Sequence, residues 1–183
     1  LIEAAFFNHK TPMLASAPSL AYRKSLYEKA HGFEGLEHLE SGDDDMLVQK
    51  MSKHTTNVIY NADPEAQVGT QPVNHWGELF TQRARWASNS TSYPSLRYTG
   101  YLLGVYSYFW LIALSPIFLA SGLINLESFL ILLASKFIPD FILLSAGTRL
   151  LKCTHLIKHI FWAEFIQVPL TVWAVPAGYF KWY

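Results

Sequence analysis

The stretch Tyr101–Ile124 reads YLLGVYSYFWLIALSPIFLASGLI and contains no charged side chain. A helix needs roughly 20 consecutive apolar residues to cross the hydrocarbon core of a bilayer. This stretch is long enough, and it predicts a membrane-spanning helix. A buried core helix of a large soluble protein is the alternative for this one segment.

Two further apolar stretches follow it. Ser128–Gly147 is interrupted by Lys136 and Asp140, which are four residues apart, so they can meet on one helix face and offset each other's charge. Ile160–Phe180 forms the third stretch, with tryptophan and tyrosine residues near its ends, as is usual at membrane interfaces. We therefore predict about three transmembrane helices.

The charged residues are distributed unevenly. Residues 1–97 hold 20 of the 28 lysine, arginine, aspartate and glutamate side chains, and residues 98–183 hold eight. We predict a polar domain over 1–97 and a transmembrane helical region over 98–183. A net formal charge of zero gives no basic field for nucleic acid, and the single cysteine, Cys153, excludes an internal disulfide. Both chain ends look cut, as in a fragment of a longer protein.

Positive charge predicts the orientation of the membrane helices. The connection from Arg149 to Lys158 carries three lysine or arginine residues, whereas the loop Asn125–Glu127 carries none. Loops rich in lysine and arginine face the cytoplasm. We therefore expect an integral protein of the cell (inner) membrane, with residues 1–97 in the cytoplasm.

The acidic segment Ser41–Met51 concentrates three consecutive carboxylates, Asp43, Asp44 and Asp45, before an apolar-spaced run. Ser41 is a natural N-cap for a helix over 43–53. Acidic residues in a first helical turn are favoured by the helix dipole, which is the structural explanation for one or two of them. Three adjacent carboxylates repel one another unless a cation or a bound substrate compensates, which is the functional explanation.

Secondary structure elsewhere in residues 1–97 is predicted from short local patterns. Residues 8–12 form a turn, Arg23–His31 a helix with Gly32 at C′, and Asn57–Tyr60 and Ala66–Thr70 two short strands. After Asn74 comes an amphipathic helix suited to a membrane surface, one face of which holds Trp76, Leu79, Phe80, Arg83 and Ala87.

A basic-aromatic segment, Gln82-Arg83-Ala84-Arg85-Trp86, lies at the end of this amphipathic helix. It has an ordinary explanation as basic residues and an aromatic anchor beside a membrane span. Its chemical explanation is that arginine and glutamine offer several donors to phosphate oxygens, while tryptophan offers a flat face to a sugar ring.

Together the two segments resemble family 2 glycosyltransferases, which include cellulose, chitin and hyaluronan synthases. Gly42–Met51 resembles their acidic pair at a helix start, and Gln82–Trp86 is a full match to their Gln-x-x-Arg-Trp motif. Ser19–Lys24 followed by Gly32-Phe33 resembles a third family segment, which ends in Gly-Gly-Phe. The chain departs from it at Ala17-Pro18-Ser19, where Gly-Ala-Asn is usual, and at His31, which replaces the first glycine of the pair.

The resemblance implies the C-terminal part of an α/β nucleotide-diphospho-sugar transferase domain of the GT-A type, followed by membrane helices. It implies inverting transfer of a sugar from a nucleotide-sugar donor to a hydroxyl of a carbohydrate or lipid-linked acceptor. Asp44 takes the position of the general base, with Asp43 and Asp45 in support. Gln82, Arg83, Arg85 and Trp86 take the positions that bind the donor diphosphate and the acceptor. A divalent cation, Mg²⁺ or Mn²⁺, is expected through an upstream motif that this chain does not contain.

A second hypothesis is a membrane transport or scaffold protein with a cytoplasmic regulatory domain. The Lys136–Asp140 pair favours it, because ionisable residues inside a membrane span are frequently functional. The capacity of the pair to neutralise itself favours a structural role instead. The sequence does not identify the donor sugar, the nucleotide, the acceptor, the oligomeric state or whether transfer is processive.

Overall fold

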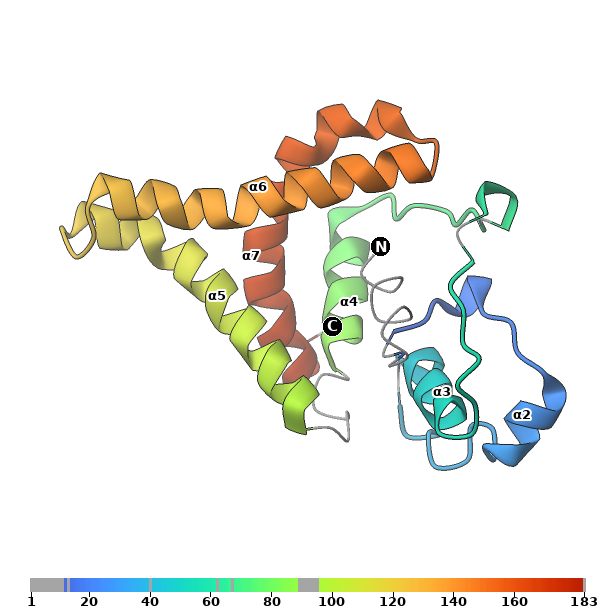
Figure 1. Ribbon diagram of the computed structural model, residues 1–183. Helices are drawn as coiled ribbons and strands as arrows, with labels where there is room; N and C mark the ends of the chain where they lie inside the picture. The colour runs from blue at the N-terminus through green and yellow to red at the C-terminus, as the bar shows by residue number, and fades with distance from the viewer. Residues whose placement is uncertain are drawn as a thin grey trace. The chain divides into compact units, whose positions relative to one another are not determined.

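A computed structural model describes residues 12, 14–39, 41–61, 63–66, 68–88 and 96–182 (Figure 1). The chain divides into two compact units, Leu1–Val73 and Asn74–Tyr183, which we describe separately. The boundary predicted at residue 97 marks a change in composition, whereas the structural units divide earlier, so that the amphipathic helix belongs with the apolar ones. The turn predicted at 8–12 lies outside the described residues except for Pro12.

The first unit is built around one helix, α3 (Asp43–Ser52). The other described elements are the 3₁₀ turns η1 (Ala17–Ser19) and η2 (Pro64–Ala66) and the short helix α2 (Lys24–Lys29). The buried face of α3 presents Leu47, Val48 and Met51 to Ala30, and partly buried apolar side chains complete the cluster: Ala15, Leu20, Leu26 and Tyr27. The helix predicted at 43–53 is therefore present, with the apolar spacing that the sequence indicated.

The start of α3 differs from the prediction by one residue. Gly42, not Ser41, is the N-cap, and its φ of 73° lies in the left-handed region that glycine adopts at little cost. The chain can then turn sharply into the helix, so that all three aspartates fall within its first turn.

The end of α2 also differs from the prediction by one residue. The Gly32 N–H donates to the Tyr27 carbonyl (2.9 Å) and the His31 N–H donates to the Glu28 carbonyl (3.0 Å), which is the Schellman pattern. His31 therefore takes the C′ position with a φ of 56°, and Gly32 follows it. Glycine usually occupies C′ in this motif, because the C′ residue adopts a left-handed conformation.

The predicted α/β class is wrong: the described residues contain helices, turns and irregular segments, and none of them forms a β-strand. Asn57–Tyr60 is irregular. At the second predicted strand, Ala66 ends a 3₁₀ turn (Pro64–Ala66), and residues 68–70 are irregular. A strand is stabilised by hydrogen bonds and side-chain contacts with a neighbouring strand. Ile59 is 81% exposed, so the large apolar side chain of this segment is not buried in a core.

The second unit consists of helices that the apolar pattern predicted closely. They are α4 (Trp76–Ala87), α5 (Leu96–Ala120), α6 (Leu126–Leu150), the 3₁₀ segment η4 (Thr154–His159) and α7 (Ile160–Tyr179). Three segments are long and apolar enough to cross a membrane: Thr99–Ala120, Leu126–Leu150 and Thr154–Tyr179. The prediction of three such helices is confirmed.

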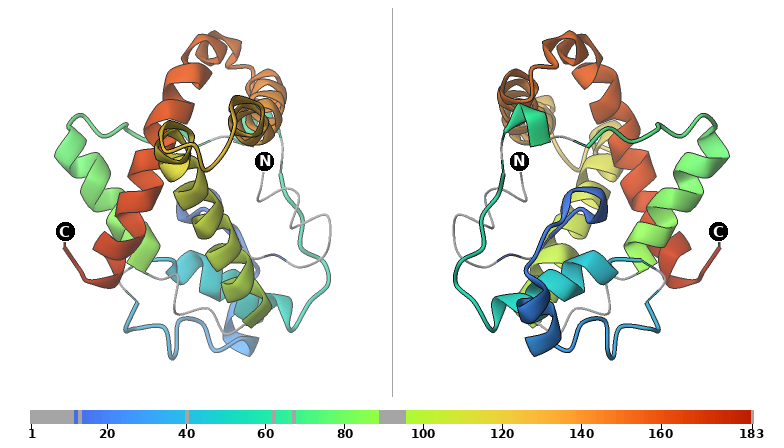
Figure 2. Two further views of the ribbon diagram at one scale, coloured as in Figure 1. Left: turned by 90° about the vertical axis from the view of Figure 1, so that its left-hand side faces the viewer. Right: turned by 90° about the vertical axis from the view of Figure 1, so that its right-hand side faces the viewer.

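Helix α7 is the centre of this unit and packs against α4, α5, α6 and η4 (Figures 1 and 2). Phe109 and Ile112 of α5 pack against Val168 of α7, and the Tyr106 hydroxyl donates to the Val172 carbonyl (3.2 Å). Higher residue numbers on α5 thus meet lower numbers on α7, so these two helices run antiparallel.

Candidate functional site

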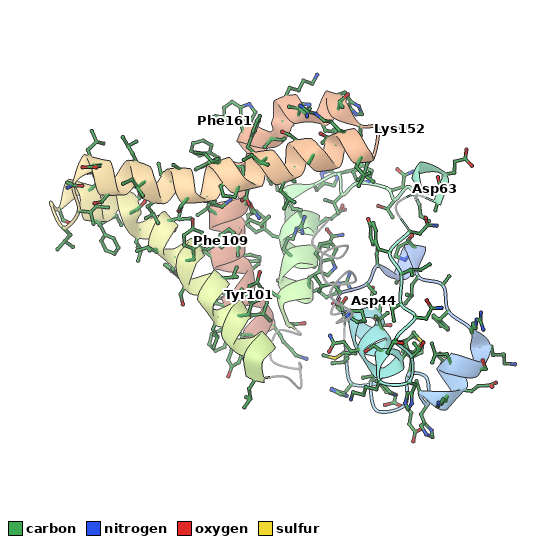
Figure 3. All side chains as sticks on the ribbon, in the orientation of Figure 1. Asp44, Asp63, Tyr101, Phe109, Lys152 and Phe161 are labelled. Carbon is green, nitrogen blue, oxygen red and sulfur yellow. The ribbon has the colours of Figure 1, made fainter. Side chains whose placement is uncertain are left out.

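The acidic segment lies at the N-terminus of α3, where Asp44 is labelled in Figure 3. Asp44 Oδ2 accepts the N–H of Ala17 (2.8 Å), and Asp44 Oδ1 accepts the N–H of Asp45 (3.0 Å). Asp45 Oδ1 accepts the N–H of Ala15 (2.6 Å). Two of the three predicted acidic residues therefore hold the 15–17 segment against the helix, while Asp43 is exposed.

The basic residue of α3 has a separate structural role. The Lys50 ammonium donates to the carbonyl oxygens of Gly32 and Glu34, both at 2.8 Å. This contact fixes the loop that follows α2. The carboxylates of Asp44 and Asp45, at the other end of α3, interact with the backbone of residues 15–17.

The carboxylates of Asp44 and Asp45 interact with backbone N–H groups. Within the part of the chain that the structure describes, no group of three histidine, cysteine, aspartate or glutamate side chains could hold a metal ion. Mg²⁺ prefers oxygen ligands in near-octahedral geometry, whereas Asp44 and Asp45 direct carboxylate oxygens to backbone N–H groups. We assign no chemical step at these residues to a metal.

The basic-aromatic segment occupies the second half of α4. Ala84 is fully buried, Gln82 and Arg85 are half-buried, and Arg83 and Trp86 are exposed. The Arg83 guanidinium lies over the Trp86 ring at 4.6 Å from its centroid, which is a cation–π contact. Partial desolvation lowers the pKa of Arg83, but a guanidinium remains charged at neutral pH.

Close packing holds α4 against α7 (Figure 2). Phe80 meets Trp173 edge to face with ring centroids 4.8 Å apart. Farther along, Gly178 faces the α4 backbone, where an added β-carbon would lie 2.8 Å from the Ser88 nitrogen. Small residues at such a crossing allow two helix backbones to approach closely. The face of α4 that contacts α7 is centred on Phe80 and Ala84, so the predicted face is rotated and Arg83 lies outside it.

The structure thus brings Gln82, Arg83, Arg85 and Trp86 together on one helix of the second unit. Asp43, Asp44 and Asp45 come together on one helix of the first unit. Helix α4 packs beside α7 (Figure 1).

A buried polar cluster joins α6 to α7. The Lys136 ammonium donates to Asp140 Oδ2 (2.8 Å), to Gln167 Oε1 (3.0 Å) and to Glu164 Oε2. The Phe109 and Phe137 rings lie 5.3 and 5.6 Å from Lys136 Nζ. The predicted Lys136–Asp140 pair is present, and α7 contributes two further partners.

The sequence analysis missed Glu164 and Gln167. A signal was available, because Glu164 is a lone carboxylate inside an apolar stretch, where an unpaired charge is costly. Helical spacing relates positions on one helix only, so the pattern could not match Glu164 to Lys136 on another helix.

Comparison of the chain with protein-family models, with curated proteins and with solved structures gave no match. The resemblance to family 2 glycosyltransferases therefore rests on the residues quoted above. The function that it implies remains a prediction.

Proposed function

We propose that this chain is part of a membrane-bound inverting glycosyltransferase, which moves a sugar from a nucleotide-sugar donor to an acceptor hydroxyl. The observation that carries the proposal is the complete motif Gln82-Arg83-Ala84-Arg85-Trp86. The motif follows the acidic start of α3 in the sequence, and the long apolar helices come directly after it. A plain membrane anchor requires basic and aromatic residues in this region, but not this complete pattern.

In the proposed reaction Asp44 is the general base. It takes the proton of the acceptor hydroxyl as that oxygen forms a bond to the anomeric carbon of the donor sugar. The bond from that carbon to the diphosphate oxygen breaks, and the nucleotide diphosphate leaves with the electron pair. Each Asp44 oxygen accepts one backbone N–H, and a carboxylate offers about four lone-pair sites, so acceptor capacity remains.

Gln82 and Arg85 are the proposed donor-binding residues. An arginine can form two parallel hydrogen bonds to a phosphate and stabilise the negative charge that develops on the leaving nucleotide. Trp86 is 49% exposed, so its ring is accessible to an acceptor sugar, and Arg83 covers part of it. We assign Arg83 to the same binding surface.

The cellular location belongs to this proposal. We propose an integral protein of the inner membrane with residues 1–97 on the cytoplasmic side, where nucleotide-sugar donors are available. The support is the length and composition of three helices and the basic connection from Arg149 to Lys158. Mg²⁺ or Mn²⁺ would be bound by residues that are not among those described.

The test compares Asp44→Asn with Asp45→Asn in the full-length protein to which this chain belongs, in membranes supplied with radiolabelled UDP-glucose, UDP-N-acetylglucosamine or GDP-mannose. Both substitutions replace a carboxylate that accepts a backbone N–H with a neutral amide. Only Asp44→Asn removes the proposed base. We expect sugar transfer to lipid or polysaccharide to be lost in Asp44→Asn and largely retained in Asp45→Asn. Equal retention in both variants would exclude Asp44 as the base, and no transfer by the unmodified protein from any donor would contradict the proposed function.

A further inference from the structure

The basic connection (residues 149–158) joins α6 to α7 through a sharp reversal of the chain. The Lys152 N–H donates to the Arg149 carbonyl (3.2 Å) and the Cys153 N–H donates to the Thr148 carbonyl (2.8 Å), which is the Schellman pattern. Lys152 takes the C′ position with a φ of 54°, a conformation that is costly for a residue with a β-carbon. The η4 segment then packs back against α6 (Figure 1). The connection is therefore a folded hairpin with a lysine at its turn.

The connection concentrates positive charge. Residues 141–163 include one arginine, two lysines and two histidines but no aspartate or glutamate. The side chains of Arg149, Lys152 and Lys158 are all exposed. In the described part of the chain, the ion pairs involve other residues. Three positive charges are thus presented to the surroundings with no carboxylate in contact.

The dipoles of the two helices explain only part of this charge. A cation is favoured near the C-terminus of a helix, which accounts for Arg149 and Lys152 at the end of α6. Lys158 directly precedes His159, the N-cap of α7, where the positive end of the helix dipole repels a cation. The first turn of α7 contains no acidic residue that would compensate. An anionic partner would therefore stabilise this end of the connection.

The position of the connection indicates which partner meets it. Helix α7 has 20 residues and is roughly 30 Å long, which matches the hydrocarbon core of a bilayer. Because the connection directly precedes α7, it lies at the surface of a membrane that α7 crosses. Exposed apolar side chains lie at the same place: Leu156 in the connection, and Phe161 and Trp162 in the first turn of α7 (Figure 3). Basic side chains beside such apolar ones are typical of segments that bind anionic lipid.

We propose that the basic connection binds the headgroups of anionic phospholipids. Arg149, Lys152 and Lys158 contact the lipid phosphates, while Leu156 and Trp162 insert among the acyl chains. The lipid supplies the negative charge that the first turn of α7 lacks. The proposal requires α7 to enter the membrane at this end. It does not require α6 to cross the membrane, and it is independent of the glycosyltransferase assignment.

The experiment uses photochemical labelling of lipid by the full chain. Leu156 and Leu111, which lies midway along α5, are each 44% exposed, and each is replaced in turn by benzoylphenylalanine. The bilayers contain equal amounts of phosphatidylglycerol and phosphatidylcholine with the same acyl chains, and mass spectrometry counts the adducts of each lipid. At position 156 we expect about fivefold more adducts of phosphatidylglycerol, the ratio that corresponds to about 1 kcal/mol for one basic side chain near a lipid surface. At position 111 the two lipids should be labelled equally.

Salt and charge variants attribute the preference to the basic side chains. Raising the salt concentration to about 1 M should reduce the ratio at position 156, because exposed charges are screened. The combined variant Arg149→Gln, Lys152→Gln and Lys158→Gln should label both lipids equally at position 156. These side chains are exposed, so the fold should be retained.

The matched control removes one arginine and two lysines from exposed positions of the first unit, as Arg23→Gln, Lys29→Gln and Lys53→Gln. It should keep the preference for phosphatidylglycerol. Equal labelling of the two lipids by the unmodified chain at position 156 would overturn the proposal and would favour a soluble acidic partner instead. A preference that persists in the first variant, or that is lost in both, would also overturn it. The salt series on the unmodified chain decides the matter even if a variant fails to fold.

Discussion

Gly178 of α7 lies so close to the backbone of Ala84 in α4 that no β-carbon fits between them. This contact fixes the helix that carries the Gln82–Trp86 motif against a long apolar helix. Because the obstructing atoms belong to the backbone, a side chain cannot simply rotate away. The close contact therefore requires glycine at position 178.

We predict that Gly178→Ala destabilises the protein by about 1–3 kcal/mol, because overpacking forces two helix backbones apart. Gly104→Ala is the matched control, since its added β-carbon meets nothing within 4 Å and alanine favours a helix by about 0.5–1 kcal/mol over glycine. The free energy of unfolding in mixed detergent micelles should change in opposite directions. A similar change in both variants would mean that α4 and α7 do not pack closely.

The Lys136 cluster predicts a second stability effect. Lys136→Met leaves Asp140 and Glu164 without their cation, which should cost about 3–5 kcal/mol, as for other broken buried ion pairs. Replacing all three residues, as Lys136→Met, Asp140→Leu and Glu164→Met, should recover most of this loss. Denaturation in sodium dodecyl sulfate measures both variants. A harmless Lys136→Met would show that the cluster does not join α6 to α7.

His31 predicts a gain in stability. Its left-handed conformation, with a φ of 56°, is costly for a residue with a β-carbon, so His31→Gly should stabilise the first unit by about 1 kcal/mol. The lost pairing with Glu34 is exposed and contributes little. Lys29→Gly, inside α2, should instead destabilise by about 0.5–1 kcal/mol. Thermal unfolding compares the two, and a destabilising His31→Gly would contradict the Schellman geometry.

The proposed function predicts the kinetics of Arg85 variants. Removing a charged donor from a phosphate costs about 1.5–3 kcal/mol, so Arg85→Ala should lower kcat/KM for the nucleotide-sugar roughly 10- to 100-fold. Arg85→Lys should recover part of this, because lysine keeps the charge but not the paired donors. If Arg85 serves only as a membrane anchor, both variants will have unchanged kinetics in detergent.

Cys153 provides a test of orientation, because it lies in the basic connection and is the one cysteine of the chain. The charge rule predicts that a membrane-impermeant maleimide labels it from the same side as residues 1–97. Three helices that each cross once would make α5 and α7 parallel, whereas these helices are antiparallel. Labelling from the opposite side would fit α5 and α7 as the crossing pair and would contradict our orientation. Inside-out and right-side-out vesicles distinguish the two outcomes.

The long helices could be predicted because their signal is local. An uninterrupted apolar run leaves the backbone no solvent partners, so a helix satisfies its own hydrogen bonds, and the predicted bounds differ from α5, α6 and α7 by a few residues. Helix α3 was predictable for a related reason, since Met46, Leu47, Val48 and Met51 supply a buried face directly after an acidic first turn.

The predicted strands failed because a strand depends on neighbours that no local pattern supplies. Asn57–Tyr60 has suitable residues, but among the described residues no second strand pairs with it. The N-cap of α3 and the C′ residue of α2 were each misplaced by one, because Gly42 and His31 adopt left-handed conformations that residue preferences indicated only approximately.

The sequence by itself determined where the apolar helices lie, where the acidic helix begins, and which residues carry the two motifs. Only the tertiary structure decided which face of α4 is buried, since that depends on Gly178 of a helix about ninety residues away. It also decided that Lys136 pairs with Glu164 as well as Asp140. The physical reason is the same in both cases: helical periodicity relates residues within one helix, whereas close packing and charge compensation depend on which helices meet.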